Sequence, residues 1–348
     1  MDEAKLHEFM GKIVTDMGGA WMMGMVLIGD ELGLYKAMAD GRPITADALA
    51  ARCGCHPRLV REWLNANAAS GYVEVVDGAY RLPPEQAMAL ANDDSPVFVA
   101  PGQSVIASCF MDLEKVLTAF RGNGAFPWGA HHHRMFHGTE KFFRPGYQAN
   151  LTTAWLPALD GVVDKLKRGA KVADVGCGHG ASTILMAKAH PNSRFVGVDF
   201  HAPSIEIAGK RAADAGLGAR VSFITATAHA YSEHDFDLIC FFDCLHDMGD
   251  PLGAARHARQ ALKDDGTVLL VEPFAGDSLA ENSTPVGRLY YSASTMVCTP
   301  NSLSQEVGLA LGAQAGEARL KQVFGEAGFT RFRRATETPF NLILEARK

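Results

Sequence analysis

The chain has 348 residues, of which 47% are hydrophobic and 21% charged, and its formal net charge is −6 at pH 7. This length suggests about two domains, and a mildly negative chain has no general affinity for nucleic acid. The 7 cysteines, an odd number without the spacing of a disulfide framework, favour reduced thiols and a cytoplasmic location. The chain starts without a basic and apolar signal segment, and its longest early apolar run, residues 21–29, is too short to span a membrane.

The first 95 residues have the pattern of a winged-helix domain. A methionine-rich helical stretch precedes two short helices, at 46–54 and 57–71, and a hairpin that turns at Asp77-Gly78. A domain of this kind that binds DNA carries a basic stripe. Here the arginines are offset by nearby acidic residues, so we expect residues 1–95 not to bind nucleic acid.

Residues 96–145 form a connector of helical character, and strand and helix patterns alternate from 146 to 348. Seven stretches in this last segment have the apolar composition of strands. They occupy residues 172–175, 194–199, 221–226, 236–242, 267–272, 329–335 and 340–346. The alternation predicts an α/β fold, and the last two stretches, joined by a turn at Thr338-Pro339, predict a terminal hairpin.

Residues 171–180 join the first of these strands to a helix through three glycines. A tight turn of this kind needs positive φ and a close backbone approach to a ligand, both of which glycine allows. Asp174, two residues before Gly176, suits a ligand that carries an ammonium. This pattern resembles the S-adenosylmethionine (SAM) loop of class I methyltransferases. Gly176-x-Gly178-x-x-Ala181 also satisfies the dinucleotide fingerprint, which leaves an NAD-dependent oxidoreductase as an alternative.

The order of the later strands and the terminal hairpin favour the methyltransferase. This resemblance implies a seven-stranded Rossmann-like sheet, SAM as cofactor and a small molecule as methyl acceptor. Asp199 ends the second strand, where family members hold the ribose hydroxyls. Thr227 stands where many members have an Asp that contacts the adenine, so we expect weaker adenine recognition. The resemblance assigns the following residues to the cofactor site: Tyr147, Asp174, Gly176, Cys177, Gly178, Gly180, Asp199, Phe200, Thr227, Ala228, Phe242 and Asp243.

The segment Leu245-His-Asp-Met resembles the Leu-His-Asp-Trp segment of small-molecule O-methyltransferases. The resemblance implies that His246 is the general base and that Glu272, at the end of the fifth strand, orients it. A His titrates near neutrality and can accept a hydroxyl proton. The alternatives are a structural His246, and methylation of a thioether or a nitrogen, which needs no strong base. A transcription factor that senses SAM would need the basic winged-helix face that this chain lacks.

The winged-helix domain resembles the N-terminal dimerisation domain of the same enzymes, which implies a homodimer. Histidines 131–133 and 137 have no cysteine or carboxylate at a metal-ligand spacing, so we expect a solvated loop and no metal site. The identity of the methyl acceptor does not follow from the sequence. Aromatic and methionine side chains are expected to line its apolar pocket: Trp21, Met25, Phe126, Trp128 and Tyr291.

Overall fold

The computed structural model describes residues 1–348 as two compact units. The N-terminal unit comprises residues 1–110 and 133–146, and the C-terminal unit comprises residues 111–132 and 147–348. The connector expected at 96–145 is thus divided between the two units. Neither unit has a helix that combines the length and the hydropathy needed to cross a membrane.

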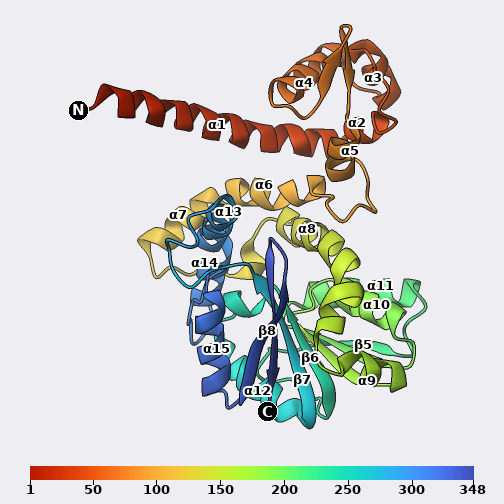
Figure 1. Ribbon diagram of the computed structural model, residues 1–348, viewed down its shortest axis with the longest axis vertical. Coiled ribbons are helices and arrows are strands. Elements are labelled where there is room, and N and C mark those ends of the chain that lie inside the picture. The colour runs from red at the N-terminus through yellow and green to blue at the C-terminus, as the bar shows by residue number, and fades with distance from the viewer. The chain divides into compact units, whose positions relative to one another are not determined.

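The N-terminal unit has the winged-helix arrangement that the sequence predicts (Figure 1). Thr45 caps α3 by accepting a hydrogen bond from the backbone N–H of Ala48. Asp77 and Gly78 both have positive φ, which suits a two-residue turn between twisted strands. The elements of this unit are α1 (Glu3–Glu31), α2 (Leu34–Ala37), α3 (Ala46–Cys53), α4 (Pro57–Ala69), β1 (Glu74–Val76), β2 (Ala79–Arg81), α5 (Pro84–Leu90), η1 (Ala100–Gly102), α6 (Gln103–Met111) and the first part of α8 (Arg134–Asn150).

Tyr35 and Trp63 anchor α1 to the core of the N-terminal unit. Their ring centroids lie 4.9 Å apart, and the indole N–H of Trp63 donates to the carbonyl of Met25, 2.8 Å away. The Tyr35 hydroxyl donates to Oδ1 of Asn67 at 2.6 Å, so its polar end is satisfied inside the core. A Cβ on Gly29 would lie 2.3 Å from the Tyr35 ring, which explains why α1 has a glycine at this crossing.

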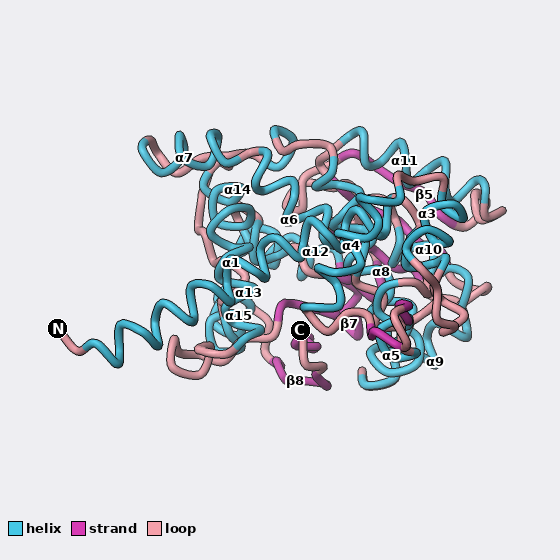
Figure 2. Tube along the Cα trace, turned by 90° about the horizontal axis from the view of Figure 1, so that it is seen from above, coloured by secondary structure: helices cyan, strands magenta, loops and turns pink.

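The first half of α1 projects beyond the rest of the N-terminal unit (Figures 1 and 2). Met10, Val14, Met17 and Trp21 recur along α1 every three or four residues, which puts them on one face. All four are exposed, and Trp21 has 74% of its surface accessible. A contiguous exposed apolar face of this kind marks an interaction surface.

The C-terminal unit is built on a seven-stranded sheet with the order β5-β4-β3-β6-β7-β9-β8. The first five strands in this order are parallel, and β9 and β8 add to them as an antiparallel hairpin. The predicted α/β fold and terminal hairpin are therefore confirmed. β7 begins at Leu262, earlier than expected, because Leu262 pairs with Phe236 before a register shift.

The sheet lies between two layers of helices, with α9, α10 and α11 on one side and α12 and α15 on the other (Figure 1). The strands are β3 (Lys171–Val175), β4 (Arg194–Asp199), β5 (Val221–Thr225), β6 (Phe236–Phe242), β7 (Leu262–Pro273), β8 (Arg331–Glu337) and β9 (Asn341–Arg347). The helices are α7 (Leu113–Arg121), η2 (Trp128–Ala130), the rest of α8, η3 (Leu151–Trp155), η4 (Leu156–Ala158), α9 (Val162–Arg168), α10 (Ala181–Ala189), α11 (Ala202–Asp214), η5 (Leu245–Asp247), α12 (Pro251–Ala261), α13 (Pro285–Ala293), η6 (Ser294–Cys298), α14 (Thr299–Leu303) and α15 (Gly316–Glu326).

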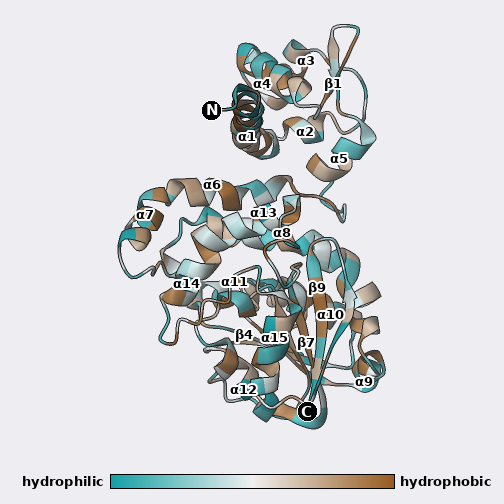
Figure 3. Ribbon diagram, turned by 60° about the vertical axis from the view of Figure 1, so that its left-hand side comes forward, coloured by the Kyte–Doolittle hydropathy of each residue, from teal (hydrophilic) through white to brown (hydrophobic).

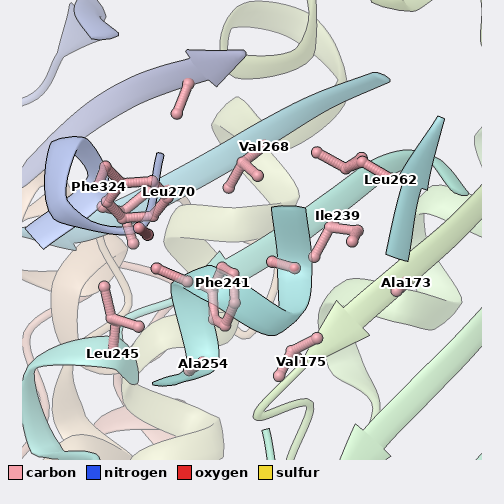
Figure 4. Packing of buried hydrophobic residues seen from close by; sticks show 14 of the residues in the cluster. Ala173, Val175, Ile239, Phe241, Leu245, Ala254, Leu262, Val268, Leu270 and Phe324 are labelled. Atoms are coloured by element: carbon pink, nitrogen blue, oxygen red, sulfur yellow. The ribbon is translucent and has the colours of Figure 1, made fainter. Parts of the chain in front are cut away.

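The core of this unit lies between the sheet and the α12–α15 layer. Phe241 of β6 and Leu270 of β7 belong to one buried cluster with Ala254 of α12 and Phe324 of α15 (Figure 4). In Figure 3 hydrophobic colouring marks parts of β7 and β9, which have apolar runs at 268–271 and 342–344. Continuous apolar runs are expected for strands that are covered on both faces.

The parallel strands bring the loops after β3, β4, β6 and β7 to one edge of the sheet. The strand order reverses between β3 and β6, since β4 lies on the other side of β3. Ligands of open α/β sheets bind at such a reversal, beyond the carboxyl ends of the strands. The fold therefore positions the candidate site at this edge.

Candidate active site

The loop after β3 depends on its glycines. Gly176 has φ of 77°, and a Cβ there would lie 2.6 Å from Sγ of Cys244 in the loop after β6. Gly178 has φ of 51° and open space where a Cβ would stand. A side chain at Gly176 would separate the two loops, and one at Gly178 would fill the space beside the backbone. The loop thus leaves room for a ligand against its main chain.

Asp174, near the end of β3, has one carboxylate oxygen with hydrogen-bond partners and one without. Its Oδ2 accepts hydrogen bonds from the hydroxyls of Ser182 and Thr183, at 2.6 and 2.5 Å. Its Oδ1 is buried and has no partner. Burial raises the pKa of this carboxyl to about 6, against the opposing effect of the two hydroxyls. An unsatisfied buried carboxylate oxygen fits a ligand ammonium, which would also favour the ionised form.

Asp199, at the end of β4, accepts a hydrogen bond from the glycine loop that follows β3. Its Oδ2 accepts from the N–H of Gly178 and its Oδ1 from the N–H of His201, both at 2.9 Å. Burial raises the pKa of Asp199, while these two backbone donors lower it. Each oxygen keeps a further lone pair for a ligand hydroxyl. The next residue, Phe200, has 52% of its surface exposed.

Tyr147, Phe242 and Asp243 come together at the end of β6. The Tyr147 ring lies 5.4 Å from that of Phe242, and its hydroxyl donates to Oδ2 of Asp243 at 3.1 Å. Asn341 of β9 donates to the other oxygen at 2.8 Å. Asp243 has φ of 50°, a strained conformation for a residue with a side chain, and such strain concentrates at functional sites. Burial, and then the charge of Glu272, raise the pKa of Asp243 to about 8.

His246 and Glu272 form a buried pair between η5 and β7. Nδ1 of His246 lies 2.6 Å from Oε2 of Glu272, and the other carboxylate oxygen accepts from the backbone N–H of Leu245 at 2.9 Å. Burial disfavours the charged imidazole, but the Glu272 carboxylate and the Cys298 thiol outweigh it. The pKa of His246 is therefore well above its usual value. The carboxylate orients the ring and leaves the second ring nitrogen for another partner.

The remaining cofactor candidates have fewer contacts and lie on the loop after β3 or just beyond β5. Cys177 is buried and its backbone N–H donates to the carbonyl of Val198 at 3.1 Å. Thr227 is exposed and Ala228 half-buried just beyond β5. Gly180 precedes α10 with φ of 77°.

Of the acceptor candidates, Phe126 and Trp128 are tied to the His246 region through α14. The Phe126 N–H donates to the carbonyl of Pro300 at 2.9 Å, and the Trp128 N–H donates to Oδ1 of Asn301 at 3.0 Å. Asn301 in turn donates to the carbonyl of Asp247 at 3.1 Å. Tyr291 of α13 is exposed, while Trp21 and Met25 belong to the N-terminal unit.

The expectation of a solvated histidine loop is wrong for His131. Its ring is buried, lies 4.1 Å from that of Phe126, and places Nδ1 3.3 Å from Oδ2 of Asp112. Burial lowers the pKa of His131, and Asp112 partly offsets this effect. No local pattern pairs these two residues, since 19 positions separate them, so the sequence carried no signal for the contact. The structure has no group of three or more Cys, His, Asp or Glu side chains that could hold a metal.

Comparison with known proteins assigns both units to described families. Residues 166–328 match a methyltransferase domain, and residues 20–92 match an Rv2258c-like winged HTH domain. Phenazine O-methyltransferase PhzM of Lysobacter antibioticus is 26% identical over 273 residues, which cover 73% of this chain and 76% of that protein. The 3-hydroxy-5-methyl-1-naphthoate 3-O-methyltransferase of Streptomyces sahachiroi is 28% identical over 300 residues, or 82% and 83% of the two chains.

A solved structure agrees with the fold over the full length. Human N-acetylserotonin methyltransferase in complex with SAM has a TM-score of 0.71 at 16% identity, and the match covers 100% of this chain and 98% of that one. The chain belongs to the SAM-dependent methyltransferases. Within them it combines the methyltransferase domain with an N-terminal winged-helix domain of the Rv2258c-like kind. The unsatisfied oxygen of Asp174 and the open glycine loop fit the cofactor that this family uses.

Proposed function

We propose that this enzyme methylates an oxygen of a small, largely apolar molecule, with His246 as general base. The buried pair of His246 and Glu272 carries this proposal, because it is a base with a dedicated orienting carboxylate at the edge where the cofactor loop ends. Nδ1 is held by Glu272, so the other ring nitrogen accepts the hydroxyl proton. The two O-methyltransferase relatives support oxygen as the acceptor atom and a flat aromatic molecule as its carrier.

SAM supplies a methyl group activated on a sulfonium, so the protein mainly has to bind and align. We assign the ammonium of its methionine portion to Asp174 and its ribose hydroxyls to Asp199. The main chain of the glycine loop, at the start of α10, faces the carboxylate. The other proposed cofactor contacts are Tyr147, Gly176, Cys177, Gly178, Gly180, Phe200, Thr227, Ala228, Phe242 and Asp243.

Phe126 and Trp128 are the proposed acceptor contacts with the best structural support, because hydrogen bonds tie their loop to α14 and so to Asp247, beside the base. Tyr291 is a third proposed acceptor contact. The proposed part of Trp21 and Met25 in acceptor binding rests on the sequence alone.

We further infer a homodimer in the cytoplasm. The exposed apolar face of α1 supports pairing with a second copy, because a face of this size is poorly accommodated in water. The seven cysteines are all free, in agreement with a reducing compartment.

The alternative within the class is methylation of a thioether or a nitrogen. The experiment that separates the two incubates the enzyme with isotopically labelled SAM and a panel of hydroxylated phenazines and naphthoates, followed by mass spectrometry. His246→Ala is expected to retain SAM binding and to lose roughly 10²–10⁴-fold in turnover. A near-native rate of His246→Ala would reject base catalysis and favour the thioether or nitrogen acceptor.

A further inference from the structure

A cavity lies at the edge of the sheet opposite the candidate active site. Its volume is about 530 Å³, and it is lined by residues at the starts of β3, β4, β5, β6 and β7 and in the loops that precede them. Parallel strands start at one edge of a sheet and end at the other, so this cavity is separate from Gly176 and Asp199 at the carboxyl ends of β3 and β4. A volume of this size suits a small-molecule ligand.

The lining of this cavity carries more positive than negative charge. Its charged residues are Lys171, Arg194, Arg220 and Lys263, against Glu233 and Asp237. Nζ of Lys171 lies 2.6 Å from Oε2 of Glu233, and Nζ of Lys263 lies 2.9 Å from Oδ1 of Asp237. The two lysines therefore compensate the two carboxylates, which leaves the guanidinium groups of Arg194 and Arg220 without an acidic partner.

The register of the strands brings three of these cations side by side. Lys171 of β3 is the direct partner of Arg194 of β4. Phe195 pairs with Val221 of β5, and its backbone N–H donates to the carbonyl of Arg220 at 2.8 Å, so Arg220 lies one strand further along the same edge. Like charges directly opposite one another on neighbouring strands destabilise a sheet. A bound anion would remove this repulsion.

The two arginines differ in how firmly they are held. The Arg220 guanidinium donates to the backbone carbonyls of Ala187, His190 and Ser193, at 3.1, 3.4 and 3.3 Å. These neutral acceptors fix its position without neutralising its charge. Arg194 is exposed at the start of β4, and its side chain forms no hydrogen bond within the protein. One guanidinium is thus preorganised and the other is free to engage a ligand, and the planar fork of each matches a phosphate or a carboxylate.

We propose that this cavity binds a small anion with a phosphate or carboxylate group, held between the guanidinium groups of Arg194 and Arg220. The site is distinct from the proposed methyl-transfer site and does not depend on the function proposed above. The bound anion joins the starts of β4 and β5, and it stabilises the folded protein because the unfolded chain has no such site.

The test is isothermal titration calorimetry of the full-length enzyme with inorganic phosphate and, separately, with citrate, at constant ionic strength. Saturating SAM is present throughout, so that the glycine loop and the start of α10 are occupied. Saturable binding of at least one probe is expected, and the probe that binds more tightly identifies the preferred group. Arg194→Gln should weaken this binding about 10-fold or more, as for the loss of a hydrogen bond to a charged group. Arg256→Gln, which removes the same charge from an exposed position on α12, is the matched control and should bind as the native enzyme does.

A second variant tests the cavity without removing an arginine. Ser222 is exposed and lines the same cavity, so Ser222→Asp adds a carboxylate that competes with the anion and should weaken its binding. Circular dichroism checks that each variant is folded. No saturable binding of either probe, or equal affinities in Arg194→Gln and Arg256→Gln, would overturn the proposal. Because methyl transfer is not measured, neither result depends on the role of His246.

Discussion

Tyr147 donates its hydroxyl hydrogen to Oδ2 of Asp243, although 96 positions separate the two residues in the chain. The bond joins the end of β6 to α8, and Asn341 donates a hydrogen bond to the other carboxylate oxygen of Asp243. Asp243 therefore keeps its strained backbone because hydrogen bonds from two other elements, α8 and β9, fix its side chain.

Replacing Tyr147 by Phe is expected to destabilise the enzyme without cofactor by about 1–3 kcal/mol, because a buried carboxylate oxygen loses its donor. Chemical denaturation measures the loss. Tyr231→Phe is the matched control, since the Tyr231 hydroxyl is buried without a hydrogen-bond partner and its removal should cost nothing. Equal losses in the two variants would show that the bond to Asp243 contributes little.

Asp199→Ala should weaken SAM binding by about 1.5–3 kcal/mol, on the order of 10- to 100-fold in Kd, because charge-assisted bonds to the ribose are lost. Isothermal titration calorimetry measures the change. Asp214→Ala, at the exposed end of α11, is the control and should bind SAM as the native enzyme does. Unaltered affinity in Asp199→Ala would remove this residue from the ribose site.

SAM affinity should fall as the pH drops through the pKa of Asp174, about 6. The ammonium of SAM needs the ionised carboxylate, which is protonated below that pH. Calorimetry at pH 5.5 and 7.5 in constant salt tests whether SAM affinity is lower at the lower pH. Asp174→Asn should bind SAM weakly at both values, and a pH dependence as steep as that of the native enzyme would assign the effect to another group.

Methyl transfer should rise with pH through a pKa above the ordinary range of histidine, because Glu272 raises the pKa of His246 and only the neutral ring accepts a proton. Glu272→Gln removes the charge, so the acid limb should move to lower pH while kcat falls about 10- to 100-fold from lost orientation. Initial rates from pH 5 to 10 measure both. If the acid limb of the pH–rate profile does not move in Glu272→Gln, the limb reports the titration of a group other than His246.

Met17→Asp combined with Trp21→Asp should convert the proposed dimer to a monomer, because two charges on the apolar face of α1 oppose its burial. Light scattering at micromolar concentration measures the mass. Glu8→Gln, an exposed change on the same helix, is the control. A native enzyme that is already monomeric would contradict the pairing role of α1.

The sequence by itself determined the features that depend on local pattern. The glycine loop after β3, the alternation of strands and helices, the terminal hairpin and the Asp77-Gly78 turn were all predicted, because each depends on residues a few positions apart. The pairing of His246 with Glu272 was implied by resemblance to a family, and the structure has the two side chains 2.6 Å apart.

Only the tertiary structure decided which distant residues share an environment. Nothing near His131 in the sequence indicates that its ring is buried beside Asp112. The bond of Tyr147 to Asp243 and the unsatisfied oxygen of Asp174 also follow from packing. Such contacts join elements that are far apart in the chain, so their geometry, and the pKa shifts that burial causes, exist only once the sheet and its helices have assembled.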